Sequence, residues 1–542
     1  MGLENNALIK KYINLDEKTE GSTTVAILVG MFAAFGGILF GYDTGTISGI
    51  LAMKYVLKTF PRDEPGLNGE PGVFSSSEHS LIVSILSAGT FFGALGAPLL
   101  SDTLGRRWTL IIASLFVFNL GIILQTASSG IPLLVAGRAF AGLGVGLISA
   151  VIPLYQAECV PRWIRGAITS LYQFAITIGL LVASCINQGT HAIDGPASYR
   201  VPVAVQFVWS TIICVGMFFL PETPRFYVFK GKDDQAALSL SRLRRLPADH
   251  PAIIDELGEI KANFEYETAQ GGGGWADCFK PKNNQLKRVM TGIWLQAFQQ
   301  LTGINFIFYY GTTFFQNSGI SNSFLISVAT NVVNVGMTLP GVALIEILGR
   351  RSLLLIGAVG MCVSELLIAI IGVSTNSDSA NKCLVAFTCI FIAFFASTWG
   401  PVAWVIIAEI MPLGIRAKGV ALSTASNWLW NFGIAYATPY LVDDAPGSAN
   451  LKSKVFFIWG GCNFLCFFFA YTTVYETKGL TLEQVDEMYD SVPNAWSSRS
   501  FVPTDHRFTR AIGGELSDEH SVSAEKQNNF GDVEHINTET TV

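Results

Sequence analysis

Residues 102–107, Asp-Thr-Leu-Gly-Arg-Arg, return with small changes as residues 346–351, Glu-Ile-Leu-Gly-Arg-Arg. Each copy follows the second apolar stretch of its half of the chain. The acidic residue, the leucine, the glycine and both arginines keep their spacing in the two copies. A motif repeated this closely predicts that the chain contains two related halves.

Two further motifs repeat in the same order. The motif after the fourth apolar stretch consists of Ala157, Glu158, Pro161, Ile164 and Arg165 in the first half, and of Ala408, Glu409, Pro412, Ile415 and Arg416 in the second. Glu222-Thr223 and Glu476-Thr477 close the two halves. Three matches in one order indicate an internal duplication.

The apolar stretches between these motifs have the length of membrane helices, about 20 residues for ~30 Å of hydrocarbon. They occupy 24–53, 80–100, 108–127, 131–155, 167–187, 201–220, 289–315, 323–347, 352–374, 384–411, 419–441 and 455–475. The sequence therefore predicts an all-α membrane protein of twelve transmembrane helices in two pseudo-symmetric six-helix bundles. Such halves can rock about a central site and give alternating access.

Composition agrees with a membrane protein, because 50% of the 542 residues are hydrophobic and 14% are charged, against about 25% charged in soluble domains. A net charge of -6 argues against a nucleic-acid partner. The nine cysteines show no metal-ligand spacing, and most fall in or beside apolar stretches, where we interpret them as packing residues. We expect no cofactor, no metal and no obligate protein partner.

Basic residues in short loops set the orientation, since such loops favour the cytoplasm. The loops with Arg106, Arg165, Arg350 and Arg416 share one side with the basic central segment. We therefore expect both termini in the cytoplasm and, as the location, the plasma membrane. The predicted domains are an N-terminal tail (1–22), two bundles (23–221 and 289–475), a cytoplasmic helical linker (222–288) and a C-terminal tail (476–542).

The linker and the tail differ in pattern. The linker alternates apolar and charged residues at helical spacing, which predicts a few short amphipathic helices, and its run Gly271–Gly274 is interpreted as a flexible connection rather than a phosphate loop. Beyond about Ser491 the chain is polar and rich in serine and acidic residues. We expect that tail to be largely disordered.

The repeated charges suggest a cytoplasmic gate in which acidic and basic residues pair across the seam between the halves when the inner side is closed. The alternative is that the arginines only fix topology, although that role requires no acidic partners. The candidate gate residues are Asp102, Arg106, Arg107, Glu158, Arg165, Glu222, Glu346, Arg350, Arg351, Glu409, Arg416 and Glu476.

These paired motifs, with Pro221-Glu222-Thr223-Pro224-Arg225, resemble the sugar porter family of the major facilitator superfamily over residues 25–490. The run 299–305, Gln-Gln-Leu-Thr-Gly-Ile-Asn, and the pair Tyr309-Tyr310 are specific to sugar porters. Within the family the chain is most similar to yeast high-affinity glucose and xylose transporters, some of which are proton symporters. It departs from the family pattern at Tyr475, where many members have proline.

A sugar pocket needs uncharged groups that donate, accept and stack, because a monosaccharide loses water from several hydroxyls on entering. The predicted helices supply such groups at positions that the resemblance identifies as sugar-contacting. These are Gln173, Gln299, Gln300, Asn305, Asn334, Trp404, Asn427 and Asn431. Any single amide can instead join two helices, but eight such residues on five helices favour a binding site.

Ionisable residues at membrane depth are expensive and usually functional. Asp43 and Arg138 lie at similar depths in the first and fourth helices, roughly 12 to 16 Å below the outer surface at ~1.5 Å per residue, and we expect them to meet. The resemblance to plant and bacterial sugar–proton symporters extends to both positions. The alternative is a static ion pair in a facilitative hexose uniporter, since yeast hexose facilitators keep the aspartate.

The remaining candidate residues give weaker functional signals. No histidine falls within a predicted span, which leaves carboxylates as proton carriers, and for Glu365 in the ninth helix we expect packing or an amide partner. Gly142, Gly144 and Gly146 lie in a membrane helix, where they favour close packing rather than a dinucleotide loop. No catalytic triad or phosphate loop appears, so we expect no enzyme activity. A channel and a transporter-like glucose sensor are the rival functions; sensors tend to carry longer tails.

Overall fold

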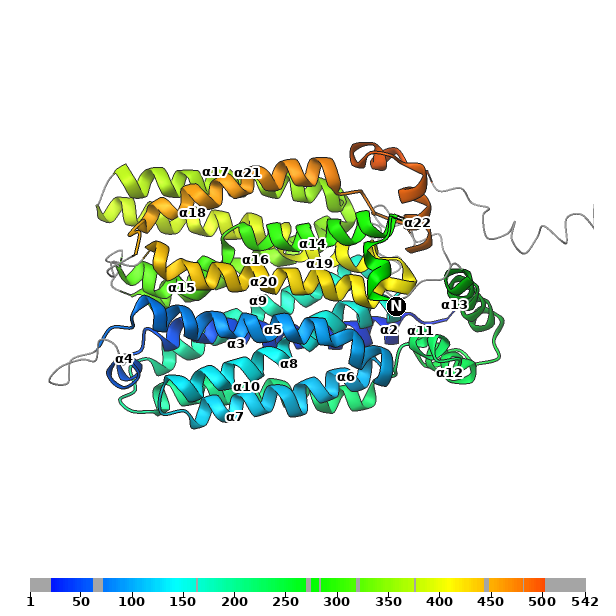
Figure 1. Cartoon of the computed structure of the whole chain (residues 1–542), viewed down its shortest axis with the longest axis horizontal. Helices are drawn as coiled ribbons and strands as arrows, with labels where there is room; N and C mark the ends of the chain where they lie inside the picture. The colour runs from blue at the N-terminus through cyan, green and yellow to red at the C-terminus, as the bar shows by residue number, and fades with distance from the viewer. Residues whose placement is uncertain are drawn as a thin grey trace, which may run out of the picture. The chain divides into compact units, whose positions relative to one another are not determined.

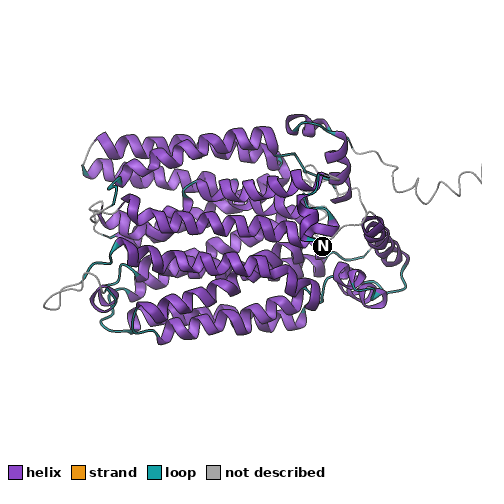
Figure 2. Cartoon of the chain, viewed as in Figure 1, coloured by secondary structure: helices purple, strands orange, loops and turns teal. Residues whose placement is uncertain are grey.

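The computed structural model describes residues 21–61, 72–161, 164–269, 274–281, 284–317, 322–374, 377–442, 448–480 and 482–502. Contacts divide the chain into Met1–Arg499 and Ser500–Val542. The account below concerns the first of these units. Its described residues form helices joined by loops (Figure 2).

The N-terminal half contains six membrane-crossing segments, drawn in blue and cyan in Figure 1. Their bounds are Thr24–Ala34 (α2) continued by Gly36–Ile50 (α3), Ser76–Leu104 (α5), Arg106–Ile112 (α6) continued by the π-helical turn Ala113–Phe118 (η2) and Asn119–Ala127 (α7), Ile131–Cys159 (α8), Arg165–Thr190 (α9) and Ala197–Phe219 (α10). The short helix Lys54–Thr59 (α4) follows α3.

The C-terminal half repeats this order in green to orange. Its segments are Gln285–Leu301 (α14) continued by Ile304–Asn317 (α15), Ser323–Leu348 (α16), Arg350–Ser374 (α17), Asp378–Ser397 (α18) continued by Trp399–Glu409 (α19), Arg416–Val442 (α20) and Val455–Thr473 (α21). The short turns Leu413–Ile415 (η6) and Lys452–Lys454 (η7) precede α20 and α21.

Within the described residues, twelve segments therefore cross the bundle, and ten of them are long and apolar enough to be recognised as membrane spans by composition. The other two are the α14–α15 pair and α20. Helices α14 and α15 have 17 and 14 residues, each shorter than a full crossing of about 20. Helix α20 carries Arg416, Lys418, Asn427 and Asn431, which lower its hydropathy.

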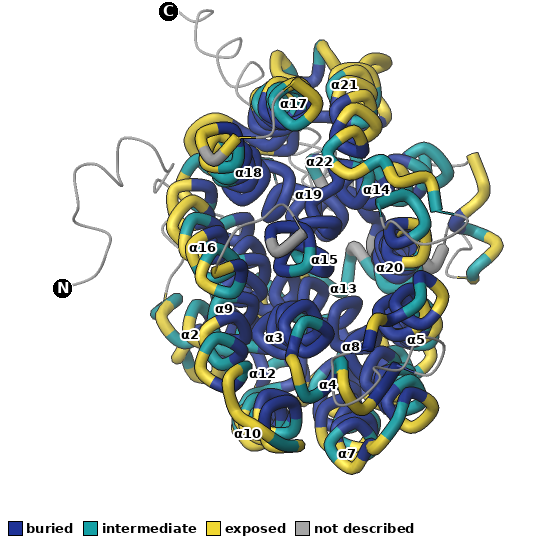
Figure 3. The backbone as a smooth tube through the Cα atoms, turned by 90° about the vertical axis from the view of Figure 1, so that its left-hand side faces the viewer, coloured by how far each residue is buried: buried dark blue, intermediate teal, exposed yellow. Residues whose placement is uncertain are grey.

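Burial is inverted relative to a soluble protein. Large apolar side chains face outward, among them Phe92, Leu99 and Phe219 at 64%, 65% and 85% exposure, whereas Asp43 and Asn334 are 1% and 0% exposed. Figure 3 shows exposed residues around the rim of the bundle and buried ones along its axis. An apolar rim around a polar interior is the arrangement that a lipid environment stabilises.

The seventh crossing is broken where the sequence places its amides. Gly303 has φ +81°, and a β-carbon there would lie 2.5 Å from the Trp459 ring. Helix α14 therefore ends at Leu301 and α15 begins at Ile304. The break turns the side chains of Gln300 and Asn305 toward each other, although five residues separate them.

Between the two halves lie the helices Pro224–Phe229 (α11), Asp233–Arg244 (α12), Pro251–Ala269 (α13) and Trp275–Phe279 (η4). The glycine run predicted to be flexible lies largely outside the described residues. The prediction of disorder beyond Ser491 is wrong for the next few residues, because Ala495–Ser500 form a helical turn (η8) after helix Leu482–Ser491 (α22).

Contacts with the start of α14 hold α22 in place. The Arg288 guanidinium forms an ion pair with Asp486 and lies 4.5 Å from the centre of the Tyr489 ring. Lys287 donates a hydrogen bond of 2.5 Å to the hydroxyl of Tyr475, whose ring stacks on Tyr489. Tyr475 is therefore part of the docking surface for the C-terminal segment.

The prediction that no histidine lies within a span is also wrong. Helix α5 begins at Ser76, earlier than its apolar stretch, because the Ser75 hydroxyl and the Glu78 side chain cap each other's backbone N–H groups. His79 consequently lies in the first turn of α5, with its ring edge-on to Tyr310. Hydropathy did not predict this turn, because its capping residues are polar.

The repeated Glu-Thr motifs cap the helices that follow the glycine-arginine motifs. The Glu222 carboxylate accepts hydrogen bonds from the N–H groups of Arg106 (3.1 Å) and Arg107 (2.9 Å). Burial raises the pKa of the Glu222 carboxyl, and the N–H of Thr223 and the Arg106 guanidinium oppose that shift.

The second half builds the same cap. The Glu476 carboxylate accepts from the N–H groups of Arg350 (2.8 Å) and Arg351 (3.1 Å). Both carboxylates fill the space beside a glycine of positive φ, Gly105 at +99° and Gly349 at +88°. A β-carbon on either glycine would lie 2.3 or 2.4 Å from a carboxylate oxygen. The positive φ and this lack of space are two separate reasons why each motif requires glycine.

We predict that Gly105→Ala and Gly349→Ala each destabilise the protein by more than about 2 kcal/mol, because backbone strain adds to a collision with the capping carboxylate. Gly231→Ala is the matched control, since Gly231 has φ +65° and nothing within 4 Å of a β-carbon. It should cost about 1 kcal/mol. Thermal unfolding of the purified variants measures the difference, and equal losses at all three positions would contradict the collision.

Candidate functional site

The predicted sugar-contacting residues are buried in the middle of the bundle, each with 7% exposure or less. At the break in the seventh crossing, the Gln300 side-chain oxygen accepts a short hydrogen bond from Asn305. It also accepts from the Asn431 amide of α20 at 3.4 Å. Three of the predicted residues, from three helices, thus form one connected group.

A second group forms around Gln299. Its side-chain oxygen accepts from Asn427 at 2.8 Å, and its amide donates to the carbonyls of Trp399 (3.0 Å) and Gly400 (2.9 Å) at the start of α19. Asn427 also donates to Gln296 at 2.6 Å. Gln296 was missed from the sequence, although it lies one turn before Gln299 on the same helix face.

The N-terminal half contacts the group around Gln300 and also Trp404. Ser87 of α5 donates to the Asn431 oxygen at 2.8 Å, as does the Tyr309 hydroxyl at 3.0 Å. Sequence analysis missed Ser87 because a lone serine in an apolar helix gives no signal. Tyr172 of α9 packs edge-on against Trp404, with ring centres 5.4 Å apart.

The remaining two predicted residues differ in their surroundings. Gln173 lies beside Gly400, with its side-chain nitrogen 3.4 Å from the position of a β-carbon there. Asn334 of α16 is fully buried, and neither atom of its amide has a hydrogen-bond partner among the described residues. A buried amide left this way is expensive, and it marks a position where a ligand hydroxyl can bind.

The site is closed toward both ends of the bundle. On the outer side, Ser48 of α3 bonds to Thr312 of α15 at 3.1 Å, and Ser80 of α5 donates to the Tyr436 carbonyl at 2.8 Å. On the inner side, Lys418 of α20 forms an ion pair with Asp102 of α5 at 3.4 Å. The structure therefore represents an occluded arrangement of the two halves.

Asp43 and Arg138 meet, as expected. A guanidinium nitrogen of Arg138 lies 3.9 Å from a carboxylate oxygen of Asp43, and both side chains are at most 2% exposed. Arg138 also donates to the Ile82 carbonyl at 2.7 Å. Neither Asp43 oxygen meets strict hydrogen-bond geometry with a described residue, and the side chain of Gln206, like that of Arg138, lies close enough to stabilise the ionised carboxylate.

Glu365 has the amide partner that the sequence suggested. Asn463 of α21 donates to its carboxyl group at 2.5 Å and to the Thr302 carbonyl at 3.3 Å. Because Thr302 lies at the break between α14 and α15, the pair of Glu365 and Asn463 connects two outer helices to that break.

The predicted gate residues form matching networks, one in each half. Arg106 pairs with Glu158 at 3.2 Å and Arg350 with Glu409 at 2.8 Å. Each glutamate also accepts from the threonine of the Glu-Thr motif, at 2.6 Å in both halves.

The second arginine of each motif points back along its own half. Arg107 donates to the Met217 and Phe218 carbonyls at the end of α10, and Arg351 donates to the Tyr471 carbonyl near the end of α21. Arginine in this position satisfies carbonyls that a helix end leaves without partners.

The expectation that the charges pair across the seam is therefore wrong for Arg106 and Arg350, which bind carboxylates of their own half. An ion pair that crosses the seam joins Asp102 to Lys418. The two halves also pack closely here. A β-carbon on Gly166 of α9 would lie 2.3 Å from both Arg350 and Glu346 of the other half. Arg165 and Arg416 are the first residues of α9 and α20.

Comparison with known proteins identifies the family. A model described as "Sugar (and other) transporter" matches residues 29–489. The major facilitator-type transporter ecdD of Aspergillus rugulosus is 55% identical over 90% of this chain and 91% of its own length. The high glucose sensor RGT2 of Saccharomyces cerevisiae is 50% identical over 88% of this chain, which spans 62% of that sensor.

A solved structure agrees in fold. The proton:xylose symporter XylE of E. coli, bound to 6-bromo-6-deoxy-D-glucose, superposes with a TM-score of 0.75 and 26% identity. The match covers 86% of this chain and all of that one.

We predict that Asp102→Lys weakens the inner closure, because it places two cations where the seam holds an ion pair. Since both side chains are partly exposed, the shift toward an inward-open form should be modest, about twofold to fivefold. Hydrogen exchange at the cytoplasmic ends of α9 and α20 measures it. The charge swap Asp102→Lys with Lys418→Asp should restore protection, and a swap that exchanges as fast as the single variant would contradict the pair.

Proposed function

This chain belongs to the sugar transporter family of the major facilitator superfamily, and on that premise we propose that it carries a monosaccharide of the glucose or xylose type across the plasma membrane by alternating access, in symport with a proton. It is a transporter rather than an enzyme. The observation that carries the sugar assignment is the connected, uncharged amide cluster around Gln299 and Gln300, enclosed between the two halves.

The chemistry of that cluster suits a monosaccharide. Sugar hydroxyls both donate and accept, and so do side-chain amides. In the occluded form the amides of Asn305 and Asn431 donate hydrogen bonds to the Gln300 side-chain oxygen. These bonds lower the free-energy cost of closing the site without a sugar. When a sugar enters, each amide exchanges one uncharged partner for another, while the Trp404 ring supplies an apolar surface for the sugar face.

We predict that Gln300→Ala and Asn305→Ala each lower uptake efficiency at least about tenfold at normal surface expression, because each leaves a desolvated sugar hydroxyl without a partner. Labelled-sugar uptake in a yeast lacking its own transporters measures this. Gln125→Ala is the control for a buried amide outside the cluster, since Gln125 of α7 packs against Gly137 of α8. Unchanged kinetics in both site variants would refute the pocket.

The second component of the proposal, coupling of sugar transport to a proton, is supported by the pair of Asp43 and Arg138. The arginine favours the ionised aspartate, whereas burial favours the neutral acid. A change in either contact as access alternates therefore changes proton affinity. The contact of 3.9 Å is long for an ion pair, so a small movement of α3 against α8 suffices.

The driving force available to such a symporter is large enough to detect. One proton crossing ~100 mV releases ~2.3 kcal/mol, and each pH unit adds ~1.36 kcal/mol. Together these sustain a sugar gradient of several hundredfold. A facilitative uniporter sustains none, and a glucose sensor gives no uptake in transporter-null yeast.

We predict that Asp43→Asn abolishes net accumulation and proton uptake yet keeps sugar exchange, because the amide imitates a permanently protonated acid. The accumulation ratio of a non-metabolised analogue, with and without a protonophore, is the measurement. His79→Asn tests a second titratable side chain, which lies on α5 one helical turn from Ile82, the residue whose carbonyl binds Arg138. If wild type gives a ratio near one under both conditions, or if only the His79 variant loses accumulation, Asp43 is not the proton carrier.

A further inference from the structure

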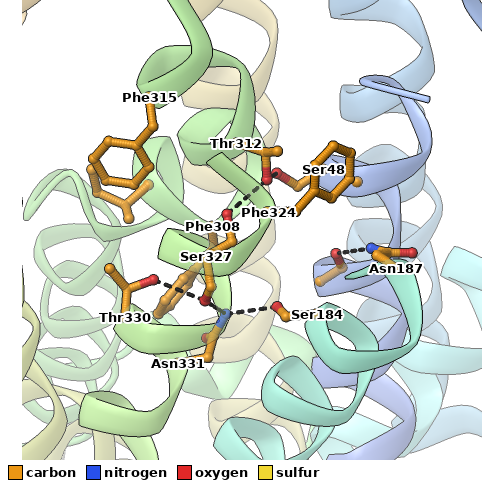
Figure 4. Close-up of a pocket in the computed structure, with 13 residues that line it drawn as sticks. Ser48, Ser184, Asn187, Phe308, Thr312, Phe315, Phe324, Ser327, Thr330 and Asn331 are labelled. Carbon is orange, nitrogen blue, oxygen red and sulfur yellow. Dashed lines mark hydrogen bonds between the residues drawn. The ribbon is translucent and has the colours of Figure 1, made fainter. Parts of the chain in front are cut away.

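A small polar cavity lies between the two halves, outward from the amide cluster. It is formed near the outer ends of α3 and α9 in the first half, and by α15 and α16 in the second (Figure 4). We call it the outer pocket. Its polar lining includes Ser48, Ser184, Asn187, Thr312, Ser327 and Asn331.

The lining is uncharged and the enclosed volume is small. No aspartate, glutamate, lysine or arginine lines the cavity among the described residues. Its volume of about 20 Å³ accommodates about one water molecule. In the occluded form the outer pocket is therefore too small for a monosaccharide, and a ligand enters it only when the halves separate.

Two hydrogen bonds close the outer pocket across the seam. Ser48 bonds to Thr312 at 3.1 Å, and the Asn331 amide donates to the Ser184 hydroxyl at 2.9 Å. Thr312 bonds further to Ser327 at 2.8 Å. Figure 4 shows the Thr312 hydroxyl between those of Ser48 and Ser327. Opening toward the outside must break both seam contacts.

Two amide oxygens in the outer pocket need a donor. Asn187 is 2% exposed and Asn331 is 6% exposed, and neither side-chain oxygen has a hydrogen-bond partner among the described residues. Their nitrogens are already used, by the Gly45 and Thr46 carbonyls for Asn187 and by Ser184 for Asn331. The ligand that suits this pocket donates hydrogen bonds and carries no charge.

The position of the outer pocket links it to the amide cluster. Asn331 lies one turn before Asn334 on α16, about 4.5 Å outward along the helix axis. Asn334 is the predicted sugar-contacting residue whose amide has no described partner. A sugar that moves between the outside and Asn334 along this helix face passes Asn331.

We propose that the outer pocket is a second monosaccharide subsite, in which hydroxyls of the incoming sugar replace the hydrogen bonds that close the seam and are then passed to Asn334. The proposal rests on the sugar transport proposed above. Replacing one uncharged hydrogen bond by another changes the free energy little, so the sugar opens its own path. A gate of ion pairs would not exchange with a sugar in this way.

The test combines Asn331→Leu with deoxy analogues of glucose. The leucine keeps the size of the side chain and removes the amide. We expect uptake efficiency for glucose to fall about threefold to tenfold. Among 2-, 3- and 6-deoxyglucose, the analogue that lacks the hydroxyl bound by Asn331 should lose less than about twofold, because that contact is already absent. Equal losses for glucose and all three analogues would overturn the subsite.

Ser80→Ala is the matched control. It removes another hydrogen bond across the seam, from Ser80 of α5 to the Tyr436 carbonyl, and Ser80 does not line the outer pocket, so its effect should be the same for every analogue. The same analogue selectivity in Ser80→Ala and Asn331→Leu would assign the effect to opening of the seam and overturn the proposal. Uptake is normalised to surface protein, and Asn331→Ala repeats the measurement if leucine is not accommodated.

Gln300→Ala in the same analogue series separates the two proposals. If Gln300→Ala lowers uptake while Asn331→Leu acts equally on all sugars, the outer subsite fails and the amide cluster stands. If Gln300→Ala has no effect on any sugar, the amide cluster itself fails.

Discussion

The hydrocarbon of a bilayer offers no hydrogen-bond partners, so polar groups inside the bundle must bind one another or a ligand. This constraint explains the groups around Gln299 and Gln300, in which side-chain amides serve as each other's partners when the site is closed. It also explains the helix ends, where Glu222 and Glu476 bind the first N–H groups of the next helix. Asn334 is one of the described residues whose side-chain polar atoms have no hydrogen-bond partner.

Duplication gave both halves the same solution at the end of the bundle that carries the repeated glycine-arginine motifs. In each half a glutamate caps a helix beside a glycine of positive φ, and an arginine of that helix binds a second glutamate. Because these bonds lie within a half, each half can move as one body. The seam between them is joined by fewer contacts, including Asp102 with Lys418.

The sequence predicted most of the crossings, because apolar length and the repeat act over many residues. It also predicted the meeting of Asp43 and Arg138, since helix rise fixes depth. It did not predict which charges pair, because Arg106 has acidic residues available on both sides of the seam. The first turn of α5 and the turn η8 were missed because capping and docking, rather than hydropathy, stabilise them.

The two closures differ in how they respond to the surrounding solution. Hydroxyl and amide contacts such as Ser48 with Thr312 carry no net charge, so dissolved ions do not screen them. The ion pair of Asp102 with Lys418 is partly exposed and weakens as ionic strength rises. If the orientation is as proposed, the salt-insensitive closure faces the medium, whose composition a cell does not control. The salt-sensitive closure then faces the cytosol, whose composition is regulated.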